Sequence, residues 1–403
     1  MNDLRSIRSG EMGVPSARPS QAARQPQAAR QPQAEQEYIP AFDYLKGLAP
    51  QRTEILAAIS KVIDSGTLIL GPEVTNFERE FADFAGIPHA VGTSSGTDAL
   101  IVALRAMRIK PGDEVITVAN GPVPTVAAIR AVGAVPRFVD VDSSNLQIVP
   151  ELVERSISSA TKCVVPIHLY GWPAPVQELA DLCQKHGLAL IEDCAQAHGT
   201  RIGSKHAGTF GDIGCFSFYP TKNLGAFGDA GMCITRRPEL AERLREQICY
   251  GYRNDRVAHR EGLNCRLDEL QAAILRVRLK YLPDALSRRQ AIADQYSAQL
   301  ADTNLALPPS LCGSSWHQYV IQLSRRSEWF DWFERHKIKV GIHYSVPIHA
   351  MPAYRCLAEA GSLPITERAC ERVISLPMYP ELTDQDIARI AYSIRAGTTA
   401  GLS

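Results

Sequence analysis

The sequence reads Gly211-Asp-Ile-Gly-Cys-Phe-Ser-Phe-Tyr-Pro-Thr-Lys-Asn-Leu-Gly-Ala-Phe-Gly-Asp-Ala230 around a single lysine, Lys222. Aromatic residues before the lysine have the pattern of a strand, and the glycines after it predict a sharp turn where that strand ends. Burial of an unpaired ammonium group is unfavourable and lowers its pKa toward the neutral, nucleophilic amine. The segment therefore predicts a reactive amine at Lys222. The alternative at this point is a structural lysine whose charge is balanced by Asp212 or Asp229.

Composition limits the classes of partner. The chain has 403 residues, of which 45% are hydrophobic and 21% charged, so it can bury a large core and is long enough for two domains. Its formal net charge is zero at pH 7. This balance gives no broad cationic field for nucleic acid or for an anionic membrane. The partners expected are small molecules and other protein subunits.

Cysteine usage and hydropathy indicate a cytoplasmic protein. The ten cysteines are scattered without a Cys-x-x-Cys pair, as expected for small buried hydrophobic residues in a reducing compartment. No apolar run approaches the roughly 20 residues that span a bilayer. The amino terminus lacks the hydrophobic core of a signal peptide.

Residues 1–36 form a low-complexity tail. The hexapeptide Ala-Ala-Arg-Gln-Pro-Gln occurs at 22–27 and again at 28–33, and bulky apolar side chains are almost absent. Such a segment buries too little surface to offset the entropy cost of ordering, so we expect it to be disordered. Its arginines would also suit an organelle-targeting peptide, which is the less ordinary interpretation.

From Tyr38 onward, helical and strand patterns alternate. Apolar residues at helical spacing predict a helix over 73–85, and the strand pattern 89–92 follows it. Further strands are predicted at 113–118, 136–140, 163–168 and 188–192, separated by helices over 98–107, 125–131 and 176–186. This alternation predicts an α/β fold in which a mostly parallel mixed sheet lies between helices. Ligand crevices in such sheets lie at the carboxyl ends of the strands.

The pattern changes in the last third of the chain. A long helix is predicted from Leu267 to about Pro283, and a second helix over 286–300. Short strands at 319–323 and 340–343 and helices over 329–335 and 384–395 follow. We therefore expect three regions, namely the tail 1–36, a large α/β domain over 37–282 and a smaller α+β domain over 283–403.

Gly92-Thr-Ser-Ser-Gly96 matches the nucleophile elbow of serine hydrolases, with Ser94 as the nucleophile. Only about 50 residues separate the tail from this motif, and no His-Gly-Gly oxyanion segment precedes it. The same turn can instead bind an anion. Gly96 permits close approach, and Thr97 opens a helix whose free N–H groups attract phosphate. A plain helix N-cap by Ser95 is the third interpretation.

Asp193 ends the apolar strand pattern, and Gln196 follows three residues later, so both side chains can face one crevice. A carboxylate in that position can bind a metal, cap a loop or pair with a heterocyclic nitrogen. A metal site is disfavoured, because no second and third ligand lie at useful spacing, even with His198 nearby. Loop capping and pairing with a nitrogen both stay open.

Taken together, these features match what pyridoxal phosphate requires. A lysine can hold the aldehyde as a Schiff base, and an aspartate can keep the pyridine nitrogen protonated as an electron sink. The helix-opening turn can anchor the phosphate. The set is coherent, because all three features lie at carboxyl ends of predicted strands.

Five segments of the sequence are informative together, because of their order and spacing along the chain. They are Ser95-Gly-Thr-Asp-Ala-Leu, Ile191-Glu-Asp193-Cys-Ala-Gln196, Phe216-Ser-Phe-Tyr-Pro-Thr-Lys222-Asn-Leu-Gly, Gly262-Leu-Asn264-Cys-Arg-Leu-Asp-Glu-Leu and Ile342-His-Tyr-Ser-Val-Pro-Ile-His349. In order and spacing they resemble the DegT-type nucleotide-sugar aminotransferases, which are fold-type I pyridoxal phosphate enzymes. The resemblance covers roughly residues 38–396.

The resemblance implies a role for each matched residue. Lys222 would form the Schiff base, and Asp193 would contact the pyridine nitrogen. The other cofactor neighbours that it implies are Gln196 beside the ring and Gly96, Thr97 and Ser217 at the phosphate. Asn264 would reach the phosphate from the neighbouring subunit, which implies a homodimer with two shared active sites.

One position departs from the family pattern. The family usually places an aromatic ring against the cofactor in the segment after the 113–118 strand, and this chain has Gly121-Pro122-Val-Pro there. Pro122 takes the place of the aromatic residue. A proline ring offers less stacking area, so we expect weaker cofactor retention or cover from another residue.

The resemblance implies a two-step transamination in which glutamate donates its amino group and a nucleotide-linked ketosugar receives it. Segments such as Ala195–Gly199 and 375–380 are similar to the subgroup that aminates a 3-keto-6-deoxyhexose on dTDP. A 4-keto sugar is the alternative substrate. The residues expected near the substrate are His343, Tyr344 and His349. A cofactor-binding regulator without turnover is a third function class, which the presence of Lys222 argues against.

Overall fold

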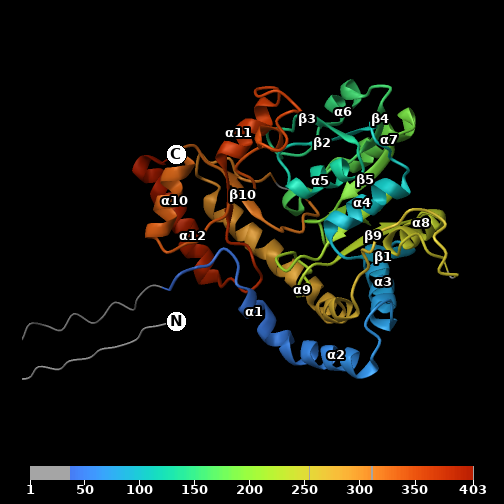
Figure 1. The fold of residues 1–403 in the computed structure, drawn as a ribbon. Helices are drawn as coiled ribbons and strands as arrows, with labels where there is room; N and C mark the ends of the chain where they lie inside the picture. Colours follow the sequence, from blue (N-terminus) through green and yellow to red (C-terminus); the bar gives the residue numbers. More distant parts are fainter. Residues whose placement is uncertain (1–36, 254, 310–311, 403) are drawn as a thin grey trace, which may run out of the picture. The chain divides into compact units, whose positions relative to one another are not determined.

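The computed structural model describes residues 37–253, 255–309 and 312–402. Residues from Tyr38 onward form one unit, shown in Figure 1. The predicted tail, 1–36, lies outside the described residues. Within the part of the chain that is described, no helix has both the length and the apolar composition that crossing a membrane requires.

A seven-stranded sheet forms the centre, in the order β1-β9-β8-β5-β4-β2-β3. Its strands are β1 (His89–Thr93), β2 (Glu114–Val118), β3 (Val135–Val139), β4 (Thr161–Val164), β5 (Ala189–Asp193), β8 (Ile213–Ser217) and β9 (Gly231–Thr235). Only β9 is antiparallel to its neighbours, β1 and β8. The prediction of a mostly parallel mixed sheet is confirmed.

Three helices precede the first strand, namely α1 (Tyr44–Leu48), α2 (Arg52–Ser65) and α3 (Pro72–Ala85). The helices that follow strands of the sheet are α4 (Gly96–Ala106), α5 (Val123–Ala131), α6 (Pro150–Ser156), α7 (Val176–His186) and α8 (Pro238–Ile248). Short elements are the 3-10 turns η1 (Ala49–Gln51), η2 (Leu169–Gly171) and η3 (Ile348–Ala350) and the hairpin strands β6 (Arg201–Ile202) and β7 (Lys205–His206). The later elements are α9 (Glu269–Leu300), β10 (Tyr319–Gln322), α10 (Arg326–Arg335), α11 (Pro364–Arg372), β11 (Val373–Leu376), α12 (Asp384–Gly397) and the π-helical end η4 (Thr398–Leu402).

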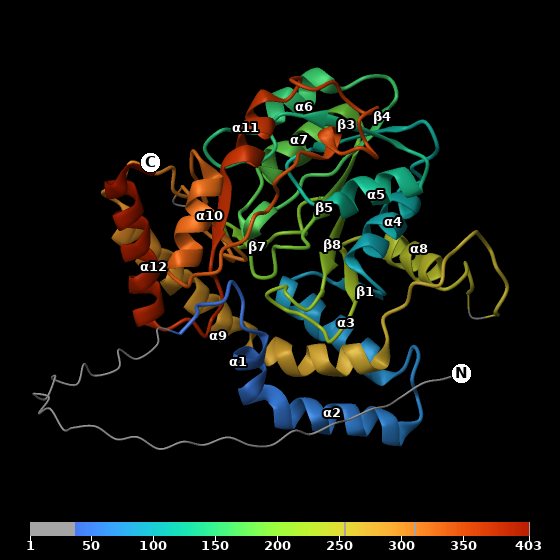
Figure 2. The same ribbon diagram turned by 60° about the vertical axis from the view of Figure 1, so that its left-hand side comes forward.

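Helices cover both faces of the sheet. Successive residues of a strand point to opposite faces. Cys215 of β8 accordingly packs in one cluster with α4, α5 and α8. The next residue, Phe216, packs in another cluster with α3 and α9. In Figure 2, α3 and α9 lie below the sheet and α4, α5 and α8 lie to its right.

Two predicted elements were wrong. The break near Pro283 does not occur, because α9 runs through that proline as one helix. A proline removes one backbone hydrogen bond, and here buried residues on both sides, Leu282 and Ile292, hold the helix in place. The predicted strand 340–343 is also absent, since only Gly341 pairs with Ser375 of β11. The domain boundary at 282/283 stays a prediction.

Candidate active site

Asp193 is the last residue of β5, and its buried carboxylate has two hydrogen-bond donors. Thr125 Oγ1 donates to Oδ2 over 2.7 Å, and the Ala195 N–H donates to Oδ1 over 3.1 Å. Burial raises the pKa of Asp193, while these donors and the charge of Lys222 oppose the rise. Each oxygen retains a lone pair, so the carboxylate can accept a further donor such as a protonated ring nitrogen.

Lys222 lies in the turn after β8, where its backbone N–H donates to the Tyr219 carbonyl over 2.8 Å. The turn is tight, since a Cβ at Gly225 would lie 2.5 Å from the Pro220 carbonyl oxygen. Burial lowers the pKa of Lys222 to about 8, against the opposing charge of Asp193. Roughly a tenth of such an amine is neutral at pH 7, so Lys222 can act as a nucleophile.

The start of α4 packs against the end of β8. A Cβ at Gly96 would lie 2.5 Å from the Cβ of Ser217, so only glycine allows this approach. Ser95 caps the helix by accepting a hydrogen bond from the Asp98 N–H over 3.0 Å. Within the described residues the Thr97 hydroxyl has no partner. The free N–H groups of the first helical turn and the hydroxyls of Thr97 and Ser217 can therefore bind a phosphate group.

The serine hydrolase alternative is not supported by the surroundings of Ser94. Ser94 Oγ donates to Asp98 Oδ2 over 2.5 Å, and Ser95 Oγ donates to the same oxygen over 2.8 Å. In the described part of the chain no histidine forms a hydrogen bond with Ser94. A nucleophilic serine needs an adjacent base that takes its proton. The N-cap interpretation of Ser95 is confirmed.

The loop that carries His343 and Tyr344 contacts Gln196 and Tyr170. Gln196 Nε2 donates to the Tyr344 hydroxyl over 3.2 Å, while Gln196 Oε1 accepts the Tyr170 N–H over 2.6 Å. The Tyr170 hydroxyl in turn donates to the His343 carbonyl. Burial, aided by the charge of Lys222, lowers the pKa of His343 to about 4, so its imidazole is neutral at pH 7. Gln196, His343 and Tyr344 are thus brought together near Lys222.

Sequence reasoning missed three residues of this site, Thr125, Tyr170 and His317. His317 Nδ1 is 3.2 Å from Asn223 Oδ1, and burial together with the Lys222 charge lowers its pKa well below the usual value. His317 lies among polar residues and gives no signal, whereas Thr125 and Tyr170 are polar residues inside apolar runs. That pattern marks a buried polar group, and only the fold identifies its partner.

Three predicted positions share no hydrogen bond with this group in the described part of the chain. His349 is buried in η3, where its Nε2 is 2.9 Å from Glu367 Oε1. Asn264 is exposed, beside Cys265, whose carbonyl accepts the Ser94 N–H over 2.9 Å. Pro122 is the N-cap of α5 and is partly exposed. The roles expected for these residues stay predictions.

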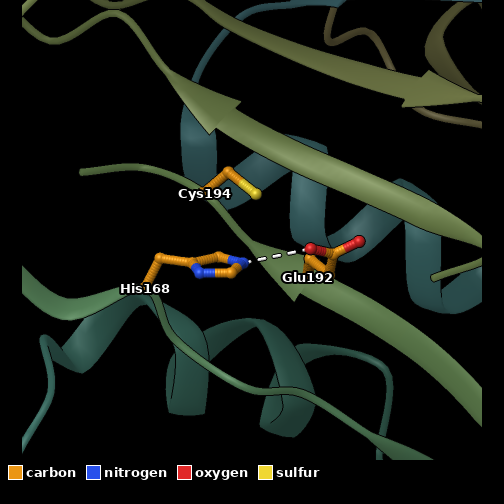
Figure 3. A group of neighbouring side chains, drawn as sticks. All are labelled: His168, Glu192 and Cys194. Atoms are coloured by element: carbon orange, nitrogen blue, oxygen red, sulfur yellow. Dashed lines mark hydrogen bonds and ion pairs between the residues drawn. The ribbon is translucent and has the colours of Figure 1, made fainter. Parts of the chain in front are cut away.

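Three possible metal ligands gather next to Asp193, contrary to the spacing argument. They are His168, Glu192 and Cys194, shown in Figure 3. The carboxylate of Glu192 already accepts four donors, the His168 Nε2–H at 3.0 Å and the N–H groups of Gly208, Phe210 and Gly211 at 2.7, 2.8 and 2.7 Å. His168 Nδ1 accepts the Ala174 N–H, so both ring nitrogens are occupied.

Cys194 is fully buried, and burial raises the pKa of its thiol well above the usual value. His168 and Glu192 form a saturated hydrogen-bond network. This network fixes loop 208–211 and the end of β5 beside Asp193.

The residues of the site fit pyridoxal phosphate. Lys222 offers a partly neutral amine, and Asp193 offers an open acceptor for a ring N–H. Gly96 and Ser217 bring hydroxyl and backbone donors close enough to surround a phosphate. The sequence-based expectation of this cofactor therefore agrees with the geometry.

Comparison with known proteins gives the same result. The model of the DegT/DnrJ/EryC1/StrS aminotransferase family matches residues 50–395. A UDP-N-acetyl-3-dehydro-alpha-D-glucosamine 3-aminotransferase from Acidithiobacillus ferrooxidans is 43% identical over 363 residues, which are 89% of this chain and 97% of that protein. A dTDP-3-amino-3,4,6-trideoxy-alpha-D-glucose transaminase from Streptomyces venezuelae is 41% identical over 365 residues, 90% of this chain and 96% of that protein.

Solved structures share the fold and hold the cofactor. S. venezuelae DesV, crystallised with a ketimine intermediate, has a TM-score of 0.88 and 41% identity, covering 90% of this chain and 98% of DesV. NtdA from Bacillus subtilis, solved with bound cofactor PMP, has a TM-score of 0.83 and 30% identity, covering 91% and 86%. The chain therefore belongs to the DegT/DnrJ/EryC1/StrS aminotransferase family and is a pyridoxal-phosphate-dependent aminotransferase of fold type I.

Proposed function

We propose that this enzyme transfers an amino group from glutamate to a ketosugar carried on a nucleoside diphosphate, and that carbon 3 is aminated. The two relatives described above support carbon 3, because both are named for a 3-amino or 3-keto nucleotide sugar. The observation that carries the chemistry is the electrostatic effect of the hydrogen-bonded carboxylate of Asp193 on Lys222, whose pKa is near 8.

The residues of the chain divide the work of proton transfer. Bound pyridoxal phosphate supplies the electron sink that makes the α-hydrogen of an amino acid acidic. Lys222 Nζ takes that proton and returns it, because a pKa near 8 makes both protonation states accessible near neutral pH. Asp193 would accept a hydrogen bond from the ring nitrogen of the bound cofactor, and Thr125 orients its carboxylate.

Substrate contacts are assigned to the loop that begins at residue 343. His343 and Tyr344 lie beside Lys222 and Gln196, which supports their assignment to the sugar site. His349 is held by Glu367, so its contribution is to place this loop or to contact the nucleotide. Pro122 would lie against the cofactor ring with less contact area than an aromatic residue.

A homodimer with shared active sites is the assembly that we propose. Ile69, Leu70, Tyr250 and Tyr252 are exposed, and they line one pocket together with Arg266. The other residues that line this pocket are mostly charged, and exposed apolar side chains within a polar rim favour an interface. Asn264 is two residues before Arg266 in the sequence and is exposed, so its side chain can enter the active site of a second copy.

The compartment that we propose is the cytoplasm. All ten cysteines are free thiols, and eight of them are at most partly exposed. Free thiols persist in a reducing compartment. A cytoplasmic nucleotide sugar would be available to the enzyme there.

The test of the function is a panel of reactions with the purified enzyme. Incubation with glutamate should shift the cofactor absorbance and yield 2-oxoglutarate, and addition of a 3-keto nucleotide sugar should restore the starting spectrum. The reverse reaction, from 3-amino and 4-amino nucleotide sugars, identifies the carbon. If only 4-amino sugars were converted, the aminated position would be carbon 4 instead of carbon 3. If no amino donor changed the spectrum, the proposed function would be wrong.

A further inference from the structure

A small cavity lies beside the turn that carries Lys222. Its volume is about 200 Å³, and its polar lining residues are Thr221, Arg289, His317, Gln318, His343 and Ser375. Leu376 and Met378 provide apolar wall. Pockets for drug-sized ligands measure roughly 300–1,000 Å³, so this cavity suits a smaller molecule than a nucleotide sugar.

Arg289 is the charged group of this cavity. It comes from α9 and is 3% exposed. Its Nη1 donates to the carbonyls of Trp316, His317 and Met378 at 2.9, 3.3 and 3.0 Å. Burial lowers its pKa to about 10, so the guanidinium stays cationic at pH 7.

Arg289 forms no ion pair in the described part of the chain, and the charge of Glu381 acts on it only at longer range, where it opposes the lowering of the Arg289 pKa. No carboxylate lines the cavity, and no ion pair joins Arg289 to Glu381, which lines the neighbouring cavity. Its Nε is buried without a partner, and its Nη2 makes no hydrogen bond with the described residues. A buried cation without an anionic partner is unfavourable, which points to an anion that is supplied from outside.

The other polar residues of the cavity are uncharged. His343 and His317 both have strongly lowered pKa values and are neutral at pH 7. His343 Nδ1 lies 2.8 Å from Ser375 Oγ, and the Oε1 atom of Gln318 is buried without a partner. One guanidinium among neutral hydrogen-bonding groups matches one carboxylate, whereas a diphosphate would require more positive charge.

We propose that this cavity is the subsite for a carboxylate of the amino donor, with Arg289 as its cationic partner. The inference rests on the proposed function, and it adds how the donor is recognised. The apolar wall receives the methylene chain of the donor. The position beside Thr221 and His343 places the rest of the donor near Lys222.

The experiment measures ligand binding without turnover. The holoenzyme is reduced with borohydride, which fixes the cofactor, and the dissociation constant of glutarate is measured by calorimetry. The variants are Arg289→Gln and Arg289→Lys. The matched control is Arg288→Gln, because Arg288 is the preceding residue of α9 but pairs with Asp384.

We expect wild-type enzyme and Arg288→Gln to bind glutarate alike, and Arg289→Gln to bind it about 10- to 100-fold more weakly, as for loss of a charged hydrogen bond. Arg289→Lys should be intermediate. The neutral analogue glutaramide should bind weakly to all four proteins. Equal affinity for glutarate in wild type and folded Arg289→Gln would overturn the inference, as would equal affinity of the wild type for glutaramide.

If the Arg289 variants do not fold, a second measurement on the wild-type enzyme tests the subsite. Crystals of reduced wild-type enzyme soaked in glutarate should show a carboxylate within hydrogen-bond distance of Arg289, and glutarate bound only elsewhere would overturn the subsite. An enzyme that transaminates glutamate but fails these tests keeps the proposed function and loses the subsite. An enzyme that transaminates no donor loses the proposed function itself, and with it the identification of the ligand as an amino donor.

Discussion

Lys222 is subject to two opposing effects, since burial lowers its pKa and Asp193 raises it, with a result of about 8. The amine is protonated and unreactive below this pKa and neutral above it. We predict that the rate constant for capture of pyridoxal phosphate by cofactor-free enzyme rises with pH through an inflection near 8. Stopped-flow absorbance measures this rate. A rate that keeps rising to the ordinary lysine pKa of about 10.4 would contradict the prediction.

Substitution of Thr125 can remove a hydrogen bond from Asp193 without leaving a cavity beside it. Thr125→Val keeps the shape but deletes the 2.7 Å hydrogen bond to Oδ2. The pKa of the buried carboxylate should rise further, and its hold on the ring nitrogen should weaken. We expect the dissociation constant for pyridoxal phosphate, measured by fluorescence titration, to increase about 10- to 100-fold. Thr125→Ser retains a hydroxyl and should bind nearly as wild type, and equal weakening in both variants would count against a positioning role.

At the scale of single residues, the sequence could predict those site residues that belong to one contiguous motif. Lys222, Asp193 and Gln196 each lie in a contiguous segment at the end of a strand, so the sequence alone could predict them as site residues. Thr125 and Arg289 belong to helices, and their partners lie far away in the chain. A hydrogen bond across 68 residues depends on sheet order and helix packing, which no local pattern contains.

Among elements, the strands and helices around the sheet were predicted closely because their apolar periodicity is strong. The pattern over 176–186 matches α7, and the pattern over 73–85 differs from α3 by one residue. The errors arose where tertiary packing overrides a local signal. Pro283 lies inside α9, and the short apolar run at 340–343 makes only one bridge.

The junction between α3 and α9 provides a test at this scale. Glu269, in the first turn of α9, accepts hydrogen bonds from the N–H groups of Gly71, Glu73 and Val74 and so caps α3. Glu269→Ala leaves these donors without their partner, and we predict a loss of about 1–3 kcal/mol in the free energy of unfolding by urea titration.

The control is Glu239→Ala. Glu239 is also in the first turn of a helix, α8, but it is exposed, and its ion pair among the described residues is with Arg237. Its loss should leave the free energy of unfolding close to that of the wild type. If the two variants were destabilised equally, the capping account of Glu269 would be wrong.

For the whole molecule, the proposed sharing of active sites can be tested by mixing subunits. Lys222→Ala lacks the reactive amine, and Asn264→Ala lacks the side chain offered to the partner. A hybrid dimer of the two variants contains one site in which both residues are native. We predict that subunits mixed in equal amounts recover roughly a quarter of wild-type activity, since half of the dimers are hybrids with one native site each. Activity of the mixture equal to the mean of the separate variants would contradict shared sites.

The central claim is that Lys222 forms the covalent link to pyridoxal phosphate, with Asp193 beside the ring. The most direct measurement is borohydride reduction of the holoenzyme, followed by proteolysis and mass spectrometry of the lysine-containing peptides. We predict a phosphopyridoxyl group on Lys222 in the wild type and none at this position in Lys222→Arg. Modification of a different lysine, or an unmodified Lys222 in an enzyme that carries cofactor and turns over, would contradict the account.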